Sequence, residues 1–95
     1  MKTYVLIAET TRHADVTASQ EWSWTPARRN GIRGWINDEG NFVAPALSEE
    51  HLRGRENLVI YLGYGFGNSA AYELARQLVA VGRAEWANAR PVAVQ

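Results

Sequence analysis

The stretch from residue 59 to residue 78, VIYLGYGFGNSAAYELARQL, constrains the fold more than any other part of the chain. It begins with apolar and β-branched residues, which are typical of a buried strand. Its second half places apolar residues at the three- and four-residue spacing of an amphipathic helix. Asn68 and Ser69 are both suitable N-caps for that helix. We therefore predict a strand over residues 57–62 and a main helix from residue 68 or 69 to about Gly82.

The glycine run between this strand and this helix has two interpretations. Gly63, Gly65 and Gly67 alternate as G-x-G-x-G, so the third glycine comes one residue too early for the dinucleotide-binding pattern. If the strand continues through the run, all three glycines lie on one face. Glycine in a strand marks close approach by another group. We expect the indole rings of Trp22 and Trp24 to lie over these glycines. The alternative is a turn that binds a small ligand or a nucleotide.

The rest of the chain alternates short apolar segments with turns. Residues 3–9 are apolar on both faces, as in an interior strand. Turn signals at Asn30-Gly31 and at residues 37–40 divide residues 21–44 into a three-stranded meander. The remaining predictions are a loop or weak strand over residues 10–20, strands over residues 21–25, 32–37 and 41–44, a short helix over residues 46–54, and an edge strand over residues 91–94.

These elements predict an α+β fold in a single domain, residues 1–95. The fold consists of a mostly antiparallel sheet of about five strands, with one main C-terminal helix and one short helix. Four tryptophans, four tyrosines and two phenylalanines supply the large buried area that so small a core needs.

The composition excludes several classes of function. The chain has no cysteine, which excludes disulfides, thiolate chemistry and cysteine-bound zinc. No segment approaches the ~20 apolar residues of a membrane helix, and the N-terminal apolar run is too short for a signal peptide. Ten basic and ten acidic residues give a formal net charge of zero, which argues against broad electrostatic capture of nucleic acid. We expect a cytoplasmic protein with no cofactor, no bound metal and no membrane partner.

The segment WSWTPARRNGIRGW, residues 22–35, is the strongest candidate for a binding site. Its arginines lie at a predicted hairpin tip, with no acidic residue between Glu21 and Asp38. Tryptophan and arginine are enriched at the centres of protein interfaces, and the same pair suits single-stranded nucleic acid. The alternative is that the tryptophans are core residues and the arginines form a solvated turn. The candidate residues for binding a protein partner are Trp22, Trp24, Arg28, Arg29, Arg33 and Trp35.

The sequence contains no recognisable catalytic machinery. His13 lies two residues before Asp15, and His51 follows two glutamates, so either histidine could act as a base or a metal ligand. Neither histidine belongs to an H-x-x-x-H pattern, and no serine lies in a nucleophile-elbow pattern. We therefore predict no catalytic residue and favour a non-enzymatic protein.

These observations favour a small binding module that docks onto a partner protein. Accessory and inhibitor proteins of phages and mobile elements are of this kind. The first alternative is binding of RNA or single-stranded DNA through the tryptophan–arginine hairpin. The second is binding of a small ligand or nucleotide at the turn from Gly63 to Gly67. A homodimer formed through an uncovered sheet edge is compatible with each of them.

Overall fold

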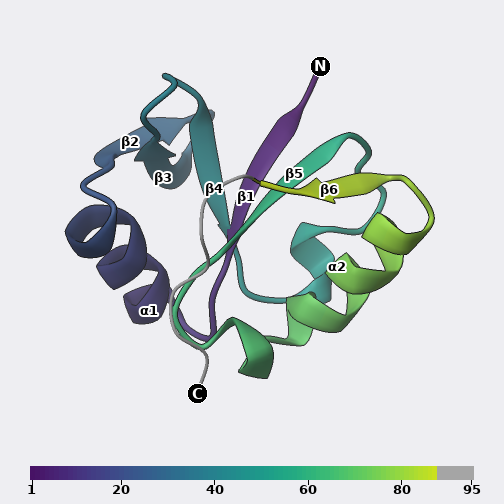
Figure 1. Ribbon diagram of the computed structural model, residues 1–95. Helices are drawn as coiled ribbons and strands as arrows, with labels where there is room; N and C mark the ends of the chain where they lie inside the picture. The colour runs from purple at the N-terminus through teal and green to yellow at the C-terminus, as the bar shows by residue number, and fades with distance from the viewer. Residues whose placement is uncertain (88–95) are drawn as a thin grey trace.

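The computed structural model describes residues 1–87, which build one mixed sheet of six strands (Figure 1). The strands are β1 (Thr3–Ile7), β2 (Thr25–Arg29), β3 (Ile32–Ile36), β4 (Phe42–Ala46), β5 (Leu58–Leu62) and β6 (Ala84–Trp86). Their order across the sheet is β2-β3-β4-β1-β5-β6. Strand β1 is parallel to β4 and β5, and β5 is parallel to β6. The β2–β3 hairpin is antiparallel and joins the sheet through antiparallel pairing of β3 with β4.

The helices lie on both faces of this sheet. They are α1 (Thr11–Asp15), which continues into the π-helix η1 (Val16–Glu21), the 3-10 helices η2 (Glu49–His51) and η3 (Phe66–Asn68), and α2 (Ala70–Ala80). In Figure 1, α1 and α2 lie on opposite sides of strands β4, β1 and β5. None of the helices in residues 1–87 is both long enough and apolar enough to cross a membrane.

The predicted α+β fold is wrong, because the structure is α/β with a mixed sheet. Strands β1 and β5 are apolar on both faces because a helix lies on each side of the sheet, which is the pattern of parallel strands. The predicted main helix is present as α2, capped by the Ser69 side chain, but it does not end the fold. It connects β5 to the parallel strand β6. The edge strand predicted over residues 91–94 lies outside the described residues.

Two hydrophobic clusters hold the layers together, one on each face of the sheet. On the α2 side, Ala71, Ala75 and Leu78 pack on Val5 and Ile60. The helical spacing thus predicts the buried face correctly for Ala71, Ala75 and Leu78, whereas Val81, which continues the same spacing, is exposed. The predicted burial of β1 on both faces is confirmed. We call the second cluster the α1-side core. It contains Leu6, Ala8, Ala14, Ala18, Trp24, Trp35, Val43 and Tyr61.

Residues 11–21 form a helix, which corrects the loop or weak strand predicted over residues 10–20. The helix buries only small side chains, Ala14, Thr17 and Ala18, so it lacks the large apolar residues that mark an amphipathic pattern. The Thr17 hydroxyl donates to the carbonyl oxygen of His13 at 2.8 Å and accepts from the backbone N–H of Tyr64 at 2.9 Å. Thr17 therefore anchors the helix to the turn after β5.

The predicted meander is partly correct. Strands β3 and β4 lie where they are predicted, but the first strand is Thr25–Arg29 and not residues 21–25. Pro26 is accommodated because β2 is an edge strand. The short helix predicted over residues 46–54 is reduced to the single turn η2.

Each main helix covers only part of its face of the sheet. The α1-side core leaves open the outer parts of β1, β5 and β6, where a large cleft lies. The α2-side cluster leaves open parts of β1, β3 and β4, where a second concavity lies. The fold thus presents two open surfaces on opposite faces of one sheet.

Candidate binding cleft

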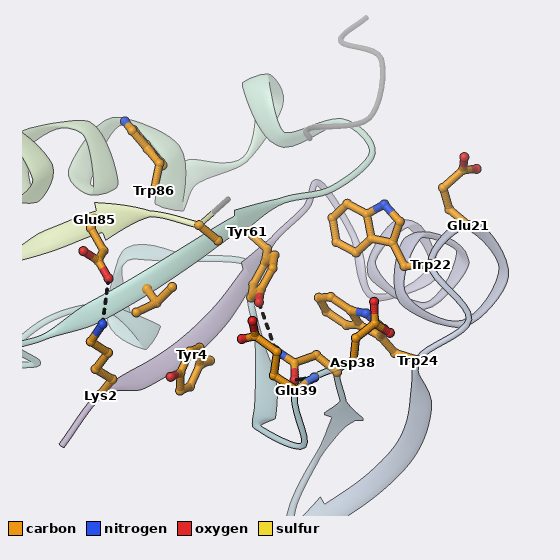
Figure 2. Close-up of a pocket in the computed structure, with 13 residues that line it drawn as sticks. Lys2, Tyr4, Glu21, Trp22, Trp24, Asp38, Glu39, Tyr61, Glu85 and Trp86 are labelled. Carbon is orange, nitrogen blue, oxygen red and sulfur yellow. Dashed lines mark hydrogen bonds and ion pairs between the residues drawn. The ribbon is translucent and has the colours of Figure 1, made fainter. Parts of the chain in front are cut away.

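The larger open surface is a cleft of about 760 Å³ on the α1 side of the sheet (Figure 2). Tyr4 of β1 and Tyr61 of β5 form its floor, and Trp22 and Trp24 form one wall. The turn between β3 and β4 forms the rim. A volume of this size lies within the range of ligand-binding clefts, roughly 300–1,000 Å³.

Three aromatic rings make up the wall and part of the floor. The ring centroids of Trp22 and Trp24 are 4.8 Å apart, and those of Trp24 and Tyr61 are 4.8 Å apart in an edge-to-face arrangement. Trp22 also contacts Tyr61, with centroids 5.9 Å apart. Trp24 is buried in the α1-side core, whereas Trp22 is only half-buried. Of these two indoles, Trp22 is therefore the one that a ligand can reach, and Trp24 supports it.

The end of η1 positions these two tryptophans. The backbone N–H of Trp22 donates to the Thr17 carbonyl oxygen at 3.0 Å, which closes the wide turn of a π-helix. Ser23 then takes a left-handed conformation with φ of 58°. The N–H of Trp24 returns to the carbonyl oxygen of Ala18 at 2.7 Å. The two rings lie together because of this turn and not because of the strand alternation predicted for residues 21–25.

Asn37 ties the rim of the cleft to its floor. Its side-chain amide donates to the Tyr61 hydroxyl oxygen at 2.9 Å. Its side-chain oxygen accepts from the backbone N–H groups of Glu39 and Asn41, both at 2.9 Å. Asn37 is itself buried, so these bonds replace the water that its side chain loses on folding. The turn that carries Asp38 and Glu39 is thereby fixed over the aromatic rings.

Tyr61 stays protonated at neutral pH. Burial raises the pKa of its hydroxyl above the ordinary value. The hydrogen bond from Asn37 acts in the opposite direction, and the negative charge of Glu39 adds to the increase. Since Asn37 donates to the Tyr61 oxygen, the hydroxyl proton can be donated to a ligand in the cleft.

The charged residues around the cleft are mostly acidic. Among residues 1–87 they are Glu21, Asp38, Glu39 and Glu85 against one cation, Lys2. Lys2 already pairs with Glu85, with Nζ and Oε2 3.2 Å apart. Glu21 accepts from the Tyr64 hydroxyl at 2.8 Å, and this bond raises the pKa of Tyr64.

Two carboxylates at the rim of the cleft have no cationic partner among the described residues. Within residues 1–87, Asp38 and Glu39 form no ion pair with any cation. The cleft therefore combines aromatic rings with uncompensated negative charge.

The predicted binding residues do not form one surface. Trp22 and Trp24 line the cleft, whereas Trp35 is buried in the α1-side core. The three arginines lie on the β2–β3 hairpin and are exposed, but none of them lines the cleft. The register places Arg29 on the opposite face of the sheet from the other two, Arg28 and Arg33. The prediction of a combined tryptophan–arginine surface is corrected accordingly.

The glycine run is a turn and not the continuation of β5. The strand ends at Leu62, and the run leads into η3. A Cβ at Gly63 would meet Thr17 and Leu6, and a Cβ at Gly65 would meet Glu9. The groups that approach these two glycines most closely are therefore not the indole rings of Trp22 and Trp24, as predicted.

The same turn uses most of its backbone donors internally. Five of its N–H groups donate to protein acceptors, those of residues 63, 64, 66, 68 and 69. A phosphate cradle needs several N–H groups that point at the ligand. This observation disfavours nucleotide binding at the turn.

Both histidines bond to groups close in sequence. The His13 Nδ1 and the Thr10 hydroxyl oxygen are 2.6 Å apart at the start of α1. The His51 Nδ1 accepts from the backbone N–H groups of Leu47 and Ser48. Across residues 1–87, no three histidine, aspartate or glutamate side chains are grouped to hold a metal ion.

The residues that complete the cleft are not among those singled out from the sequence; they are Tyr4, Asn37, Asp38, Glu39, Tyr61 and Glu85. One signal was available, since Tyr4 and Tyr61 place polar-tipped rings on two otherwise apolar strands. The register pairs Tyr4 with Val59 and Leu6 with Tyr61, and this alignment depends on parallel pairing between distant segments. No family model, curated protein or solved structure matches the chain.

Proposed function

We propose that the protein is a non-enzymatic binding module whose acidic aromatic cleft takes up an arginine-bearing segment of a partner protein. The observation that carries this proposal is the position of Asp38 and Glu39. Both carboxylates are held over an aromatic cluster without a compensating cation in the described part of the chain.

Arginine matches this chemistry better than other side chains. Its planar guanidinium stacks on aromatic faces and also donates bidentate hydrogen bonds to carboxylates. In the cleft, the Trp22 ring supplies the face, and Asp38 and Glu39 supply the acceptors. A guanidinium over an indole contributes about 0.5–2 kcal/mol, depending on how much water the contact excludes. Lysine has no planar group to stack and is expected to bind less tightly.

The cleft supports the other functions less well. In the described part of the cleft, phosphate groups of nucleic acid would meet four carboxylates and a single cation, Lys2, which is already paired. No serine, threonine or histidine of residues 1–87 lines the cleft, so these residues form no serine–histidine or threonine–histidine pair there. The proposal therefore retains docking onto a protein, and it includes the accessory or inhibitor role and the cytoplasmic location expected from the sequence.

Fluorescence anisotropy with a defined peptide tests the proposal. The probe is a fluorescein-labelled pentapeptide, Gly-Arg-Gly-Arg-Gly, and its control replaces both arginines by citrulline, which keeps the shape and loses the charge. We expect the arginine peptide to bind at low salt and the citrulline peptide to bind at least about tenfold more weakly, as loss of two charge-assisted contacts implies.

Variants locate the binding to the cleft. Asp38→Asn combined with Glu39→Gln should weaken binding by about three- to tenfold, the effect of two partly exposed ion pairs. The matched control, Glu49→Gln with Glu50→Gln, removes two adjacent carboxylates that pair with Arg53 elsewhere on the surface. Equal weakening by both double variants would show that binding depends on general charge and would contradict the proposal.

A further inference from the structure

The second concavity lies on the opposite face of the sheet, beside α2. It has a volume of about 650 Å³ and lies over parts of β1, β3 and β4. Val43 points into the α1-side core, so its neighbours Phe42 and Ala44 point to this opposite face. The half-buried ring of Phe42 therefore forms part of the floor.

This concavity is basic, in contrast to the acidic cleft. Its lining includes Lys2, Arg29, His51 and Arg55, and no aspartate or glutamate. Arg29 and Arg55 are exposed, and within residues 1–87 neither forms an ion pair. The zero net charge of the chain thus conceals two open surfaces of opposite charge.

Arg29 and Phe42 form a stacked pair on this surface. The guanidinium carbon of Arg29 lies 5.1 Å from the centroid of the Phe42 ring. Gly34 makes the position of the ring possible, because a Cβ there would clash with the carbonyl oxygen of Val43 and lie 2.9 Å from the ring. Glycine on β3 therefore lets the Phe42 ring lie close to the strand.

This combination fits single-stranded nucleic acid. Unpaired bases stack on aromatic rings and on guanidinium planes, while cations meet the phosphates. Asn30 and Asn41 also line the concavity and offer amide donors and acceptors for base edges. A duplex hides the faces of its bases, and an acidic peptide has no base to stack.

We propose that this basic concavity binds a short single strand of RNA or DNA. One base stacks on the Arg29–Phe42 pair, and the phosphates on either side meet Arg29 and Arg55. Lys2 and Tyr4 line both this site and the acidic cleft, but Arg29, Phe42 and Arg55 line only this site. The inference therefore rests on these three residues and not on what the cleft binds.

Anisotropy of a fluorescein-labelled octauridylate, titrated with the full chain at several salt concentrations, tests this inference. Phe42→Leu should weaken binding at least about fivefold, the effect of losing one stacked base. Arg29→Gln combined with Arg55→Gln should lower the slope of log K against log salt by up to about 1.4, since each lost phosphate contact accounts for about 0.7.

The matched control is Arg28→Gln with Arg33→Gln. It removes two exposed arginines of the same hairpin that face the other side of the sheet, and it should leave binding within about twofold, as expected of surface changes away from a site. If Phe42→Leu fails to fold, the two arginine pairs decide the test. Absence of octauridylate binding at low salt would overturn the inference. Equal loss in both arginine pairs would overturn it too, as would equally tight binding of an octaglutamate peptide.

Discussion

The side-chain amide of Asn37 donates a 2.9 Å hydrogen bond to the hydroxyl oxygen of Tyr61 and so joins the β3–β4 turn to the centre of the sheet. The two residues are 24 positions apart in the chain. Asn37 also accepts two backbone N–H groups of its own turn. The position of Asp38 and Glu39 over the cleft therefore depends on this one buried side chain.

Replacement of Asn37 should destabilise the protein and also loosen the turn that holds Asp38 and Glu39 at the cleft. Asn37→Ala removes three hydrogen bonds and leaves two backbone N–H groups to find other acceptors, so the free energy of unfolding should fall by about 1–3 kcal/mol. Urea denaturation measures this change.

Asn41→Ala is the matched control in the same turn, because no hydrogen bond involves its side chain within residues 1–87. It should change the free energy of unfolding by less than about 0.5 kcal/mol. Similar losses in both variants would contradict the role given to Asn37.

Stability should fall at alkaline pH, and Tyr61 should account for part of the fall. Because burial raises the pKa of Tyr61 in the folded state, the unfolded chain loses this proton first, near the ordinary tyrosine value of about 10. The contribution of Tyr61 is therefore complete below about pH 10 and is lost as the pH rises through the folded pKa. Urea denaturation at a series of pH values should show a shallower decline for Tyr61→Phe than for the unchanged protein. Identical slopes would mean that the pKa of Tyr61 is not raised.

Small substitutions at the contact between Thr17 and the turn after β5 should lower the free energy of unfolding. Thr17→Val keeps the shape but removes the acceptor of the Tyr64 N–H and the donor to His13, so about 1–3 kcal/mol should be lost. Gly63→Ala should cost a similar amount, about 1–3 kcal/mol, because its Cβ would lie 2.9 Å from the Thr17 hydroxyl oxygen.

Thermal denaturation compares these variants with Thr11→Val. Thr11 is exposed at the start of the same helix, and its substitution should change stability by less than about 0.5 kcal/mol. A Gly63→Ala variant as stable as the unchanged protein would show that the turn can move away from the helix without cost.

The parts of the fold that sequence predicts are those with a strong local pattern. Strand β5 and helix α2 follow from apolar runs and helical spacing within 20 residues, and Ser69 caps the helix where expected. The helix at residues 11–21 escapes prediction because it buries two alanines and a threonine and not large apolar side chains. Its stability comes from tertiary contacts, such as that of Thr17 with Tyr64.

The direction of strand pairing is not contained in any local pattern. The alternation of β1 shows that both its faces are buried, but not that β4 and β5 both run parallel to it. That information lies in the connections, which lead from the interior strand β1 to the edge strand β2 and from β4 past β1 to β5. The predicted antiparallel sheet fails for this reason.

The binding residues are predicted in part, for a similar reason. Trp22 and Trp24 are visible in the sequence as a local pair, and both line the cleft. Tyr61 and Asp38 join them only because the sheet places β5 and the β3–β4 turn beside the end of η1 (Figure 2). The net charge of zero does not reveal the acidic cleft or the basic concavity, because their opposite charges cancel in the sum.

The most direct measurement is a nuclear magnetic resonance titration of the ¹⁵N-labelled full chain with the unlabelled pentapeptide Gly-Arg-Gly-Arg-Gly. The indole N–H signals of the tryptophans report separately on the cleft and on the core. We predict that the signal of Trp22 shifts most, that Trp24 shifts with it, and that Trp35, buried in the α1-side core, shifts least. Shifts confined to residues outside the cleft, or no shift at millimolar peptide, would contradict the account of the cleft as an arginine-binding site.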